Sequence, residues 1–257
     1  MTSAASLALA SLLTAGCHVV FGADAPSADA PTSAVDSAFP DGCQPTTFEV
    51  PASADTFLLA EASSCMGNPS PARYGAFSNI NIGMVAMQSL PPSRGLFRFT
   101  LSDDLGARLR NGVAPRAARL TLRTQDEPVA AANLHAYLIR SDWTEGSNSA
   151  YDGASWCVRQ STTMSMYTDW EEPGADGDRD PSLLASVSLA SLPSRSEFSL
   201  EDSPSALQRI PDAYNVADRA LSLIVILDTG SPVSVLSREG AAAEGGTPPT
   251  LSLTFCE

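Results

Sequence analysis

Lysine is absent from this chain, and histidine is almost absent. All 15 basic residues are arginines, and the histidines are His18 and His135. Without lysine the chain has no Schiff-base lysine, no Ser–Lys dyad and no phosphate-loop lysine. So few histidines exclude a multi-histidine zinc site, and a Ser–His–Asp triad would have to use His135. His135 lies in the strand-like run "NLHAYLIR" without a catalytic motif, so we interpret it as structural.

Positive charge is scarce as a whole. The chain has 29 acidic residues against 15 basic ones, and its formal net charge is −14 at pH 7. Such a protein repels a phosphate backbone, which disfavours nucleic-acid binding. The hydrophobic fraction of 44% is nevertheless typical of a globular protein, and 257 residues suffice for one large β domain.

The N-terminal apolar stretch is too short to span a membrane, which takes about 20 residues. Residues 1–16, "MTSAASLALASLLTAG", carry no charge and end in small residues, which predicts a signal peptide. The tail "LLTAGC" resembles a bacterial lipobox, and this predicts lipidation of Cys17 and an outer-membrane or cell-surface lipoprotein. The alternative is an ordinary secretory signal and a secreted protein. Residues 17–43 are rich in Ala, Pro, Ser and Asp, which predicts a flexible tether.

No CxxC pair occurs, which disfavours a zinc site. If Cys17 carries lipid, four cysteines remain, an even number that favours two disulfides in an exported chain. Three pairings are possible. We favour Cys43 with Cys256 because these residues bracket the domain, and this leaves Cys65 with Cys157.

Sustained helical periodicity is also missing, and the one predicted helix is "SPSALQRI", residues 203–210. Residues 44–257 instead contain short runs of alternating or continuous apolar residues, separated by turn-forming residues. The runs are "TFEV", "DTFLLA", "INIGMVA", "GLFRFTL", "ARLTLRT", "LHAYLIR", "ASVSLA", "EFSL", "LSLIVILD", "VSVLS" and "TLSLTFC". "LSLIVILD" is apolar throughout and is expected to lie centrally, covered on both faces. The pattern predicts an all-β sandwich of two antiparallel sheets, and we expect a monomer.

An ordered series of short motifs runs through this domain. It reads "ADTFLL", "RYGAFSNINIG", "RGLFRFTL", "RAARLTLRT", "SDWTEG", "GASW", "DWEEPGADGD", "SREG" and "PPTLSLTF". The series resembles the DNRLRE-type domains of secreted bacterial and archaeal proteins, a group that overlaps carbohydrate-binding modules reported to bind alginate. The resemblance covers about residues 46–255 and departs from the family at Arg73 and in the insert "SSCMGNPSPA". It implies an extracellular jelly-roll sandwich without catalytic residues, attached to carbohydrate or to a cell surface.

Tryptophans are few and crowded together. Trp143, Trp156 and Trp170 fall within 28 residues, with Tyr151 and Tyr167 among them. Flat aromatic rings stack on the apolar faces of sugars, so the three tryptophans are candidate ligand-binding residues. The alternative is that they are buried and hold long loops in place, which is the usual role of tryptophan.

Arginines supply a second candidate for the ligand site. Arg98, Arg119, Arg123 and Arg140 lie in strand-like runs. On a common face their guanidinium groups would bind the carboxylates of an acidic polysaccharide, and Arg98 is the candidate binding residue. The alternative is that each arginine pairs with a carboxylate of the protein.

The loop "DWEEPGADGDRD", residues 169–180, is rich in carboxylates. Calcium prefers oxygen ligands, and the alternating Asp176, Asp178 and Asp180 are candidate ligands for it. The loop lacks the EF-hand pattern, and the alternative is a solvated turn. Asp55 would join the same ion only if the fold brings it close. The later "SREG" segment is interpreted as structural.

The sequence therefore predicts a non-catalytic carbohydrate-binding module on a surface-anchored lipoprotein, with an acidic polysaccharide as the candidate ligand and calcium as the candidate cofactor. The alternative is a structural or adhesive spacer that contacts other proteins at the cell surface. A polysaccharide-cleaving enzyme built on His135 and Tyr137 is disfavoured.

Overall fold

The structure is a computed structural model, and the compact unit that contains its described residues is Phe39–Glu257. It describes residues 42–60, 65, 74–83, 92–125, 130–147, 152–163, 166–202 and 204–256. The predicted signal peptide, Cys17 and the tether up to residue 41 lie outside the described residues.

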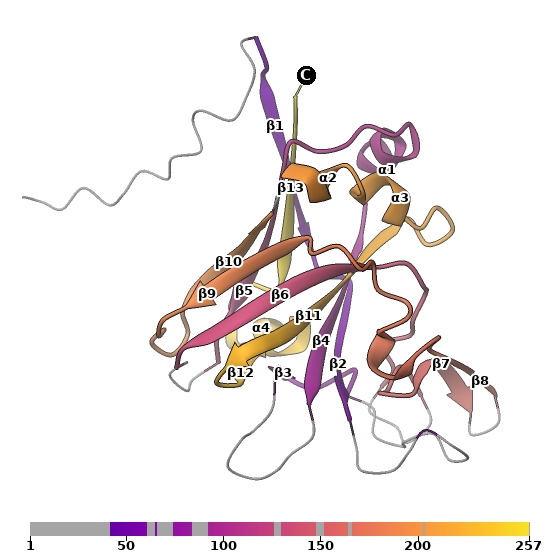
Figure 1. The fold of residues 1–257 in the computed structure, drawn as a ribbon, viewed down its shortest axis with the longest axis vertical. Helices are drawn as coiled ribbons and strands as arrows, with labels where there is room; N and C mark the ends of the chain where they lie inside the picture. The colour runs from indigo at the N-terminus through magenta and orange to yellow at the C-terminus, as the bar shows by residue number, and fades with distance from the viewer. Residues whose placement is uncertain are drawn as a thin grey trace, which may run out of the picture. The chain divides into compact units, whose positions relative to one another are not determined.

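The fold is all-β, as predicted, and its sheets are antiparallel. Each of the strand-like runs of the sequence forms a strand (Figure 1). These strands are β1 (Pro45–Pro51), β2 (Ala54–Leu59), β3 (Asn79–Ile82), β4 (Ser93–Thr100), β5 (Ala117–Arg123), β6 (Ala132–Ile139), β9 (Ala185–Leu189), β10 (Glu197–Asp202), β11 (Ala220–Gly230), β12 (Val233–Leu236) and β13 (Thr250–Cys256). The structure adds a hairpin that the sequence reading missed, β7 (Val158–Thr163) and β8 (Met166–Asp169).

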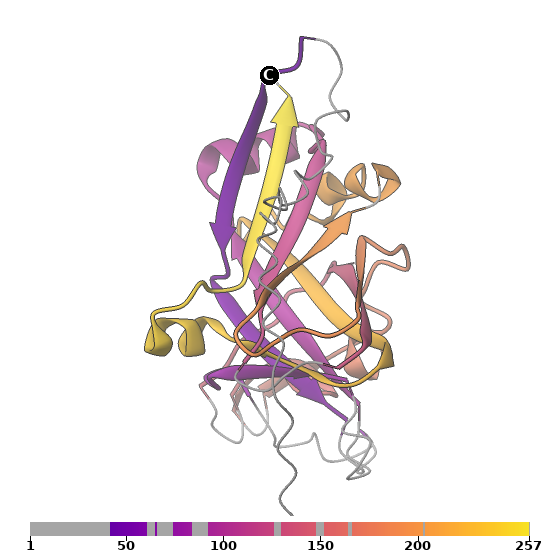
Figure 2. The same ribbon diagram turned by 90° about the vertical axis from the view of Figure 1, so that its left-hand side faces the viewer.

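The two layers of the sandwich are the halves of a single sheet. The nine-stranded sheet has the order β1-β13-β5-β10-β9-β6-β11-β4-β2, and β12–β3 and β7–β8 form separate pairs. The halves join where β10 meets β9 through only two paired positions. In Figure 2, β1, β13 and β5 lie side by side, with β4 and β11 behind them at an angle. The predicted sandwich is therefore present, but its two layers are continuous rather than two separate sheets.

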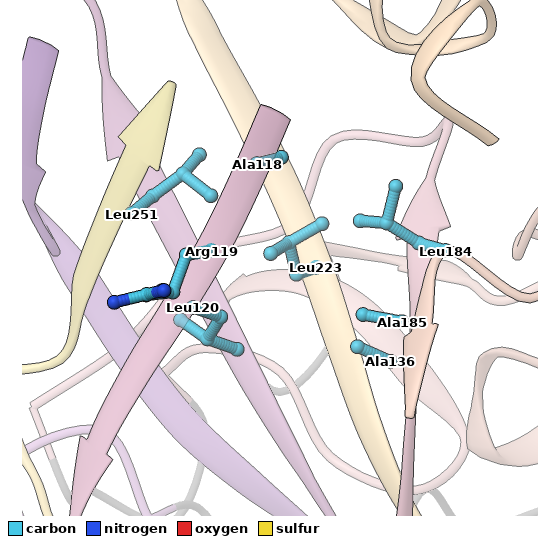
Figure 3. A pocket seen from close by; sticks show the side chains of 8 residues that line it. All are labelled: Ala118, Arg119, Leu120, Ala136, Leu184, Ala185, Leu223 and Leu251. Carbon is cyan, nitrogen blue, oxygen red and sulfur yellow. The ribbon is translucent and has the colours of Figure 1, made fainter. Parts of the chain in front are cut away.

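Leucines that alternate along the strands fill the space between the layers. Leu120 of β5 and Leu251 of β13 are paired neighbours, and Figure 3 shows them across from Leu223 of β11. The cavity left among these side chains has a volume of about 10 Å³, which is roughly enough for a single water molecule. Such close packing is what apolar burial of alternating strand residues produces.

The layer that contains β2, β4, β11 and β6 is covered on both faces. A second apolar cluster lies on its other face, where Leu58, Leu96 and Ile224 pack with Trp143 and Trp170. This explains the continuously apolar run in β11, because its odd and even residues are buried on opposite faces. The predicted central position of that run is confirmed, although residues 228–230 at its end are exposed.

Four α-helices and one short 3-10 helix occur among the described residues: α1 (Asp103–Arg110), α2 (Pro204–Leu207), α3 (Ile210–Ala213), α4 (Arg238–Glu244) and η1 (Pro173–Ala175). The predicted helix at 203–210 is confirmed in part, since it breaks into α2 and α3. The sequence reading missed α1 and α4, although serine N-caps begin both: Ser102 accepts from the Leu105 N–H and Ser237 from the Gly240 N–H. None of the described helices has the length and apolar character needed to cross a membrane.

Both favoured disulfides are formed. Cys43 bonds to Cys256, 213 residues apart, and Cys65 bonds to Cys157, 92 residues apart. The first links the start of β1 to the end of β13, which are antiparallel neighbours. The two disulfides indicate an oxidising, extracellular environment.

Candidate functional site

Two of the three tryptophans hold loops rather than face solvent. Trp143 is 1% exposed and its Nε1–H donates to Ser222 Oγ at 3.1 Å. Trp170 is 4% exposed and its Nε1–H donates to the Ser155 carbonyl at 2.8 Å. Neither ring presents a face to a ligand, so the prediction of a sugar platform is wrong for Trp143 and Trp170. Burial of a ring with a bonded N–H is the ordinary arrangement of tryptophan in a core.

Trp156 and Arg98 are half-buried, and other side chains cover them. The Arg94 guanidinium lies 4.8 Å from the centre of the Trp156 ring, which closes one face of that ring. Arg98 lies 4.7 Å from the Trp143 ring, and its Nη2 donates to the Trp143 carbonyl. Arg98 therefore braces the Trp143 loop, a structural use of a cation–π contact.

Among the described residues of this region, the exposed aromatic ring is Tyr167, on the hairpin β7–β8. Tyr167 is 46% exposed and the adjacent Met166 is 66% exposed. Both border an open hollow of about 350 Å³, whose other lining residues are Gln160, Ser161, Thr162 and Thr168. The hollow thus combines one aromatic ring and one flexible apolar side chain with hydroxyl and amide groups.

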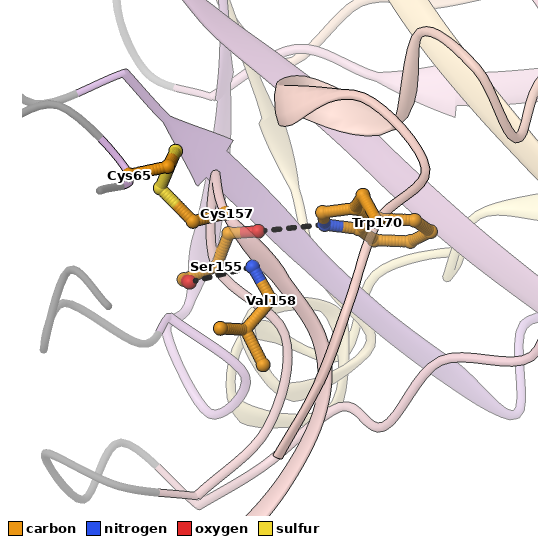
Figure 4. The surroundings of a disulfide bond; sticks show 5 residues. All are labelled: Cys65, Ser155, Cys157, Val158 and Trp170. Carbon is orange, nitrogen blue, oxygen red and sulfur yellow. Dashed lines mark hydrogen bonds between the residues drawn. A yellow bond between two sulfur atoms is a disulfide. The ribbon is translucent and has the colours of Figure 1, made fainter. Parts of the chain in front are cut away.

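The base of this hairpin is fixed from several sides (Figure 4). Cys157, directly before β7, is bonded to Cys65. The Ser155 carbonyl receives the Trp170 Nε1–H, and the Val158 N–H donates to Ser155 Oγ at 3.3 Å. Because Trp170 directly follows β8, the disulfide and the buried indole hold both strands of the hairpin, so a ligand would meet a pre-organised surface.

The four arginines named from the sequence do not share a face. Arg98 lies on β4 in one layer, whereas Arg119 and Arg123 lie on β5 in the other. Arg140 follows β6 and donates to Asp180 at 2.6 Å. The predicted positive strip therefore does not form, because these strands belong to opposite layers of the sandwich.

The carboxylates of the acidic loop take separate partners. Asp176 receives two bonds from the Arg94 guanidinium and one from Arg179 Nε. Asp178 Oδ2 accepts from the Glu171 N–H at 2.6 Å. Among the described residues, these aspartates are not in the group of three acidic side chains whose ligand atoms converge. Asp178 and Asp180 are buried, so the loop is not a solvated turn either. It docks beside β6, where the Asp180 N–H donates to the Leu138 carbonyl.

Asp180 holds this docked loop most tightly. Its Oδ2 accepts from Arg140 and Arg209, each at 2.6 Å, and its Oδ1 from the Ser182 N–H at 2.8 Å. Burial opposes ionisation of Asp180, but the Ser182 N–H and the two arginines outweigh it, so the pKa of this carboxyl lies below its ordinary value.

We expect Asp180→Asn to lower the free energy of unfolding by about 2 kcal/mol at pH 7, because two half-exposed arginines lose their charged partner. A carboxyl with a lowered pKa contributes stability above the unfolded value of about 4, and this contribution is lost as the pH falls through the folded pKa. The difference between variant and wild type should therefore shrink at pH 3. Urea unfolding at both pH values measures it, with exposed Glu172→Gln as the control. An equal difference at both pH values would contradict the assignment.

A different acidic group does converge. Asp55, Glu145 and Glu239 each place one carboxylate oxygen within 4.8 Å of the others. Arg238 lies among them: its Nη2 bonds to Glu145 Oε2 at 3.0 Å and to Glu239 Oε1 at 2.5 Å. We call these four residues the acid cluster. They come from "ADTFLL", "SDWTEG" and "SREG", motifs far apart in the sequence.

The backbone also participates in the acid cluster. The Asp55 N–H donates to Glu145 Oε1 at 2.8 Å, and the Arg238 N–H donates to Asp55 Oδ2 at 2.7 Å. Calcium would require six to eight oxygen ligands. Here the guanidinium already serves as the central cation, so the arrangement fits an ion-pair cluster better than a metal centre.

Close backbone crossings position Glu145. A Cβ on Gly75 would collide with the Glu145 carbonyl, and one on Gly146 would collide with the Asp152 carbonyl. Gly146 also has φ +82°, a left-handed conformation that suits glycine. The glycines of "RYGAF" and "SDWTEG" indicate in the sequence that another backbone segment passes close by. A glycine alone does not show which segment this is, so the sequence could not predict the position of Glu145.

Burial is the dominant influence on the charges of the acid cluster. Asp55 is 1% exposed, and burial raises its pKa to about 7, with further contributions from Glu239 and Glu145 and an opposing one from the Arg238 N–H. Burial also raises the pKa of Glu145. These shifts mean that the acid cluster holds a proton at mildly acidic pH.

Comparison with protein-family models gives no match to this chain, and neither does comparison with curated proteins. The resemblance to DNRLRE-type domains therefore stays a prediction, and the functional argument depends on the geometry of the site.

Proposed function

We propose that this protein is an exported, non-catalytic carbohydrate-binding module and that the hairpin β7–β8 carries its binding surface. The observation that carries the proposal is the hollow at Tyr167, where an exposed ring lies beside hydroxyl and amide side chains. A sugar offers an apolar ring face and several hydroxyl groups, and the hollow offers a partner for each.

A neutral glycan fits this surface better than the acidic polymer considered from the sequence. No arginine lines the hollow in the described part of the hairpin. Exposed carboxylates instead lie at the end of β8 and directly after it: Asp169, Glu171 and Glu172. The formal charge of −14 adds a long-range repulsion of polyanions. The nearby Arg94, which borders a separate groove at the ends of β4 and β11, is already bonded to Asp176.

A non-catalytic role is supported by the surroundings of His135. Its half-buried ring packs edge-on against Tyr137, 6.4 Å between centroids, and its strand neighbours are Ser186 and Ile226. This is the packing of a structural strand residue. Lipidation of Cys17 and a tether over residues 17–43 would then present a monomeric module at the cell surface.

A structural spacer is the second candidate, and two observations favour it. The Cys43–Cys256 disulfide ties together both ends of the sandwich, and buried tryptophans stiffen its loops. These features resist unfolding whether or not a ligand binds. Glycan binding at Tyr167 separates the two functions.

We expect Tyr167→Ala to reduce binding to a neutral polysaccharide about five- to thirtyfold, because loss of one stacking ring removes on the order of 1–2 kcal/mol. The thermal midpoint should hardly change, since Tyr167 is 46% exposed. Affinity electrophoresis in gels that contain β-glucan, mannan or alginate measures the effect. The matched control is Val216→Ala, which truncates another exposed apolar residue. If the neutral gels retained wild type and Tyr167→Ala equally, the binding surface assigned to Tyr167 would be contradicted.

A further inference from the structure

The acid cluster joins three parts of the chain that lie far apart in the sequence. Asp55 belongs to β2, Glu145 to the loop after β6, and Arg238 and Glu239 to α4. Through Ser237, whose Oγ donates to the Phe77 carbonyl at 2.6 Å, α4 also contacts the segment before β3. The acid cluster is therefore the junction at which α4 docks on the sandwich.

The charges of this junction do not balance. Three carboxylates and one guanidinium give a net charge of −2 if all four groups are ionised. Asp55 is almost wholly buried, and Glu239 Oε2 is a buried atom without a hydrogen-bond partner among the described residues. Keeping three carboxylates charged around a single guanidinium is costly in a protein interior. One added proton reduces the imbalance and gives the junction one more hydrogen-bond donor.

We propose that the acid cluster is a proton-operated latch: a proton on Asp55 holds α4 against β2, and release of that proton loosens α4. Asp55 keeps its bond from the Arg238 N–H in the closed state, and its hydroxyl becomes available to the unpartnered oxygen of Glu239. In the open state, Asp55, Glu145 and Glu239 are all charged and repel one another, and only one arginine offsets this repulsion.

The direction of the pH effect follows from the groups that face Asp55. These are Glu145, Arg238 and Glu239, and the pKa of Asp55 is about 7 in the folded protein. In the unfolded chain it is about 4. Between these values the folded state keeps a proton that the unfolded state has released, so stability falls as the pH rises from about 4 to 7. Above that window both states are ionised, and the loss is complete.

Loosening has a structural consequence close to the junction. Phe57, two residues after Asp55 on the same face of β2, stacks on Tyr74 with ring centroids 4.1 Å apart, and Phe77 packs edge-on against both. Release of α4 also frees Ser237 from Phe77. The latch thus controls how firmly this aromatic group is held at mildly alkaline pH.

The test compares the full chain with Asp55→Asn, which keeps the size of the side chain and cannot ionise. Urea unfolding at pH 5 and pH 8 should show the unfolding constant of wild type rising roughly a hundredfold more than that of the variant, as expected for pKa values of about 7 and 4. Asp228→Asn, the same change at an exposed carboxylate, should keep the wild-type profile. Equal pH dependence in wild type and Asp55→Asn would overturn the latch.

A second measurement needs no variant and so applies even if Asp55→Asn does not fold. Hydrogen exchange of the Gly240 and Ala241 amides in wild type, corrected for the intrinsic pH effect, should accelerate at least tenfold from pH 6 to pH 8, whereas the strand amides of β11 should not. Both helix amides bond to Ser237 in the closed state. Unchanged protection of α4 would contradict the proposal. So would protection restored at pH 8 by about 1 mM calcium, because a cation site would then replace the proton.

Discussion

Trp143→Ala is expected to lower the free energy of unfolding by about 3–5 kcal/mol. The ring is 1% exposed and packs in the second apolar cluster with Leu96 and Ile224. Its removal leaves a cavity against the outer face of β4 and β11. The Ser222 hydroxyl loses its hydrogen-bond donor, and Arg98 loses the ring on which it lies. Because the segment that follows carries Glu145, the effect should extend to the acid cluster.

Chemical unfolding at pH 7 with circular dichroism measures this loss, and Trp156→Ala is the matched control. Trp156 is only half-buried, so its truncation should cost about half as much. Trp143→Phe should lie between wild type and Trp143→Ala, since it retains most of the apolar contact but not the bond to Ser222. A loss below about 1 kcal/mol for Trp143→Ala would contradict the loop-holding role.

Removal of the Cys43–Cys256 disulfide is the second large effect. This disulfide closes a loop of 213 residues. The chain-entropy account gives about 5 kcal/mol as an upper estimate for the free energy of unfolding that is lost without it. The Cys65–Cys157 disulfide closes 92 residues, so its loss should cost about 0.7 kcal/mol less. Paired Cys→Ser variants and guanidinium unfolding measure both values.

The two disulfides should also separate stability from binding. Below the unfolding midpoint, the Cys43→Ser, Cys256→Ser variant should still bind glycan, because its hairpin base is intact. The Cys65→Ser, Cys157→Ser variant should bind several-fold more weakly, since one support of the hairpin is lost. The same binding loss in both variants would contradict the separate roles, as would a loss of stability under 1 kcal/mol without Cys43–Cys256.

The strands were predictable because their signal is local. In β5, for example, Leu120 and Leu122 are buried, whereas Arg119 beside them is exposed and Thr121 between them is half-buried, so alternation alone predicts the burial. β7 was missed because "VRQSTT" has no alternating apolar residues, and its partner β8 is exposed along its whole length. This hairpin is held by its base, through Cys157 and Trp170, rather than by a buried face.

The site residues were less predictable because their roles depend on distant partners. Trp143 and Tyr167 are both aromatic residues of loop-rich sequence, but one is buried against β11 and the other stands on a hairpin. Asp176 and Asp55 are both carboxylates next to turns, yet one pairs with Arg94 and the other is buried beside α4. Which carboxylate meets an arginine is a property of the sheet order, which short motifs do not encode.

The measurement that tests the central claim most directly is binding of the full chain to a polysaccharide array, once with calcium and once with a chelator. The account predicts binding to at least one neutral polymer, equal in both conditions, because Tyr167 and its polar neighbours need no ion. Binding to an acidic polymer only when calcium is present would contradict the assigned surface and would indicate a calcium-dependent site built on carboxylates. Binding to no polymer in either condition would contradict the glycan function and favour the structural spacer.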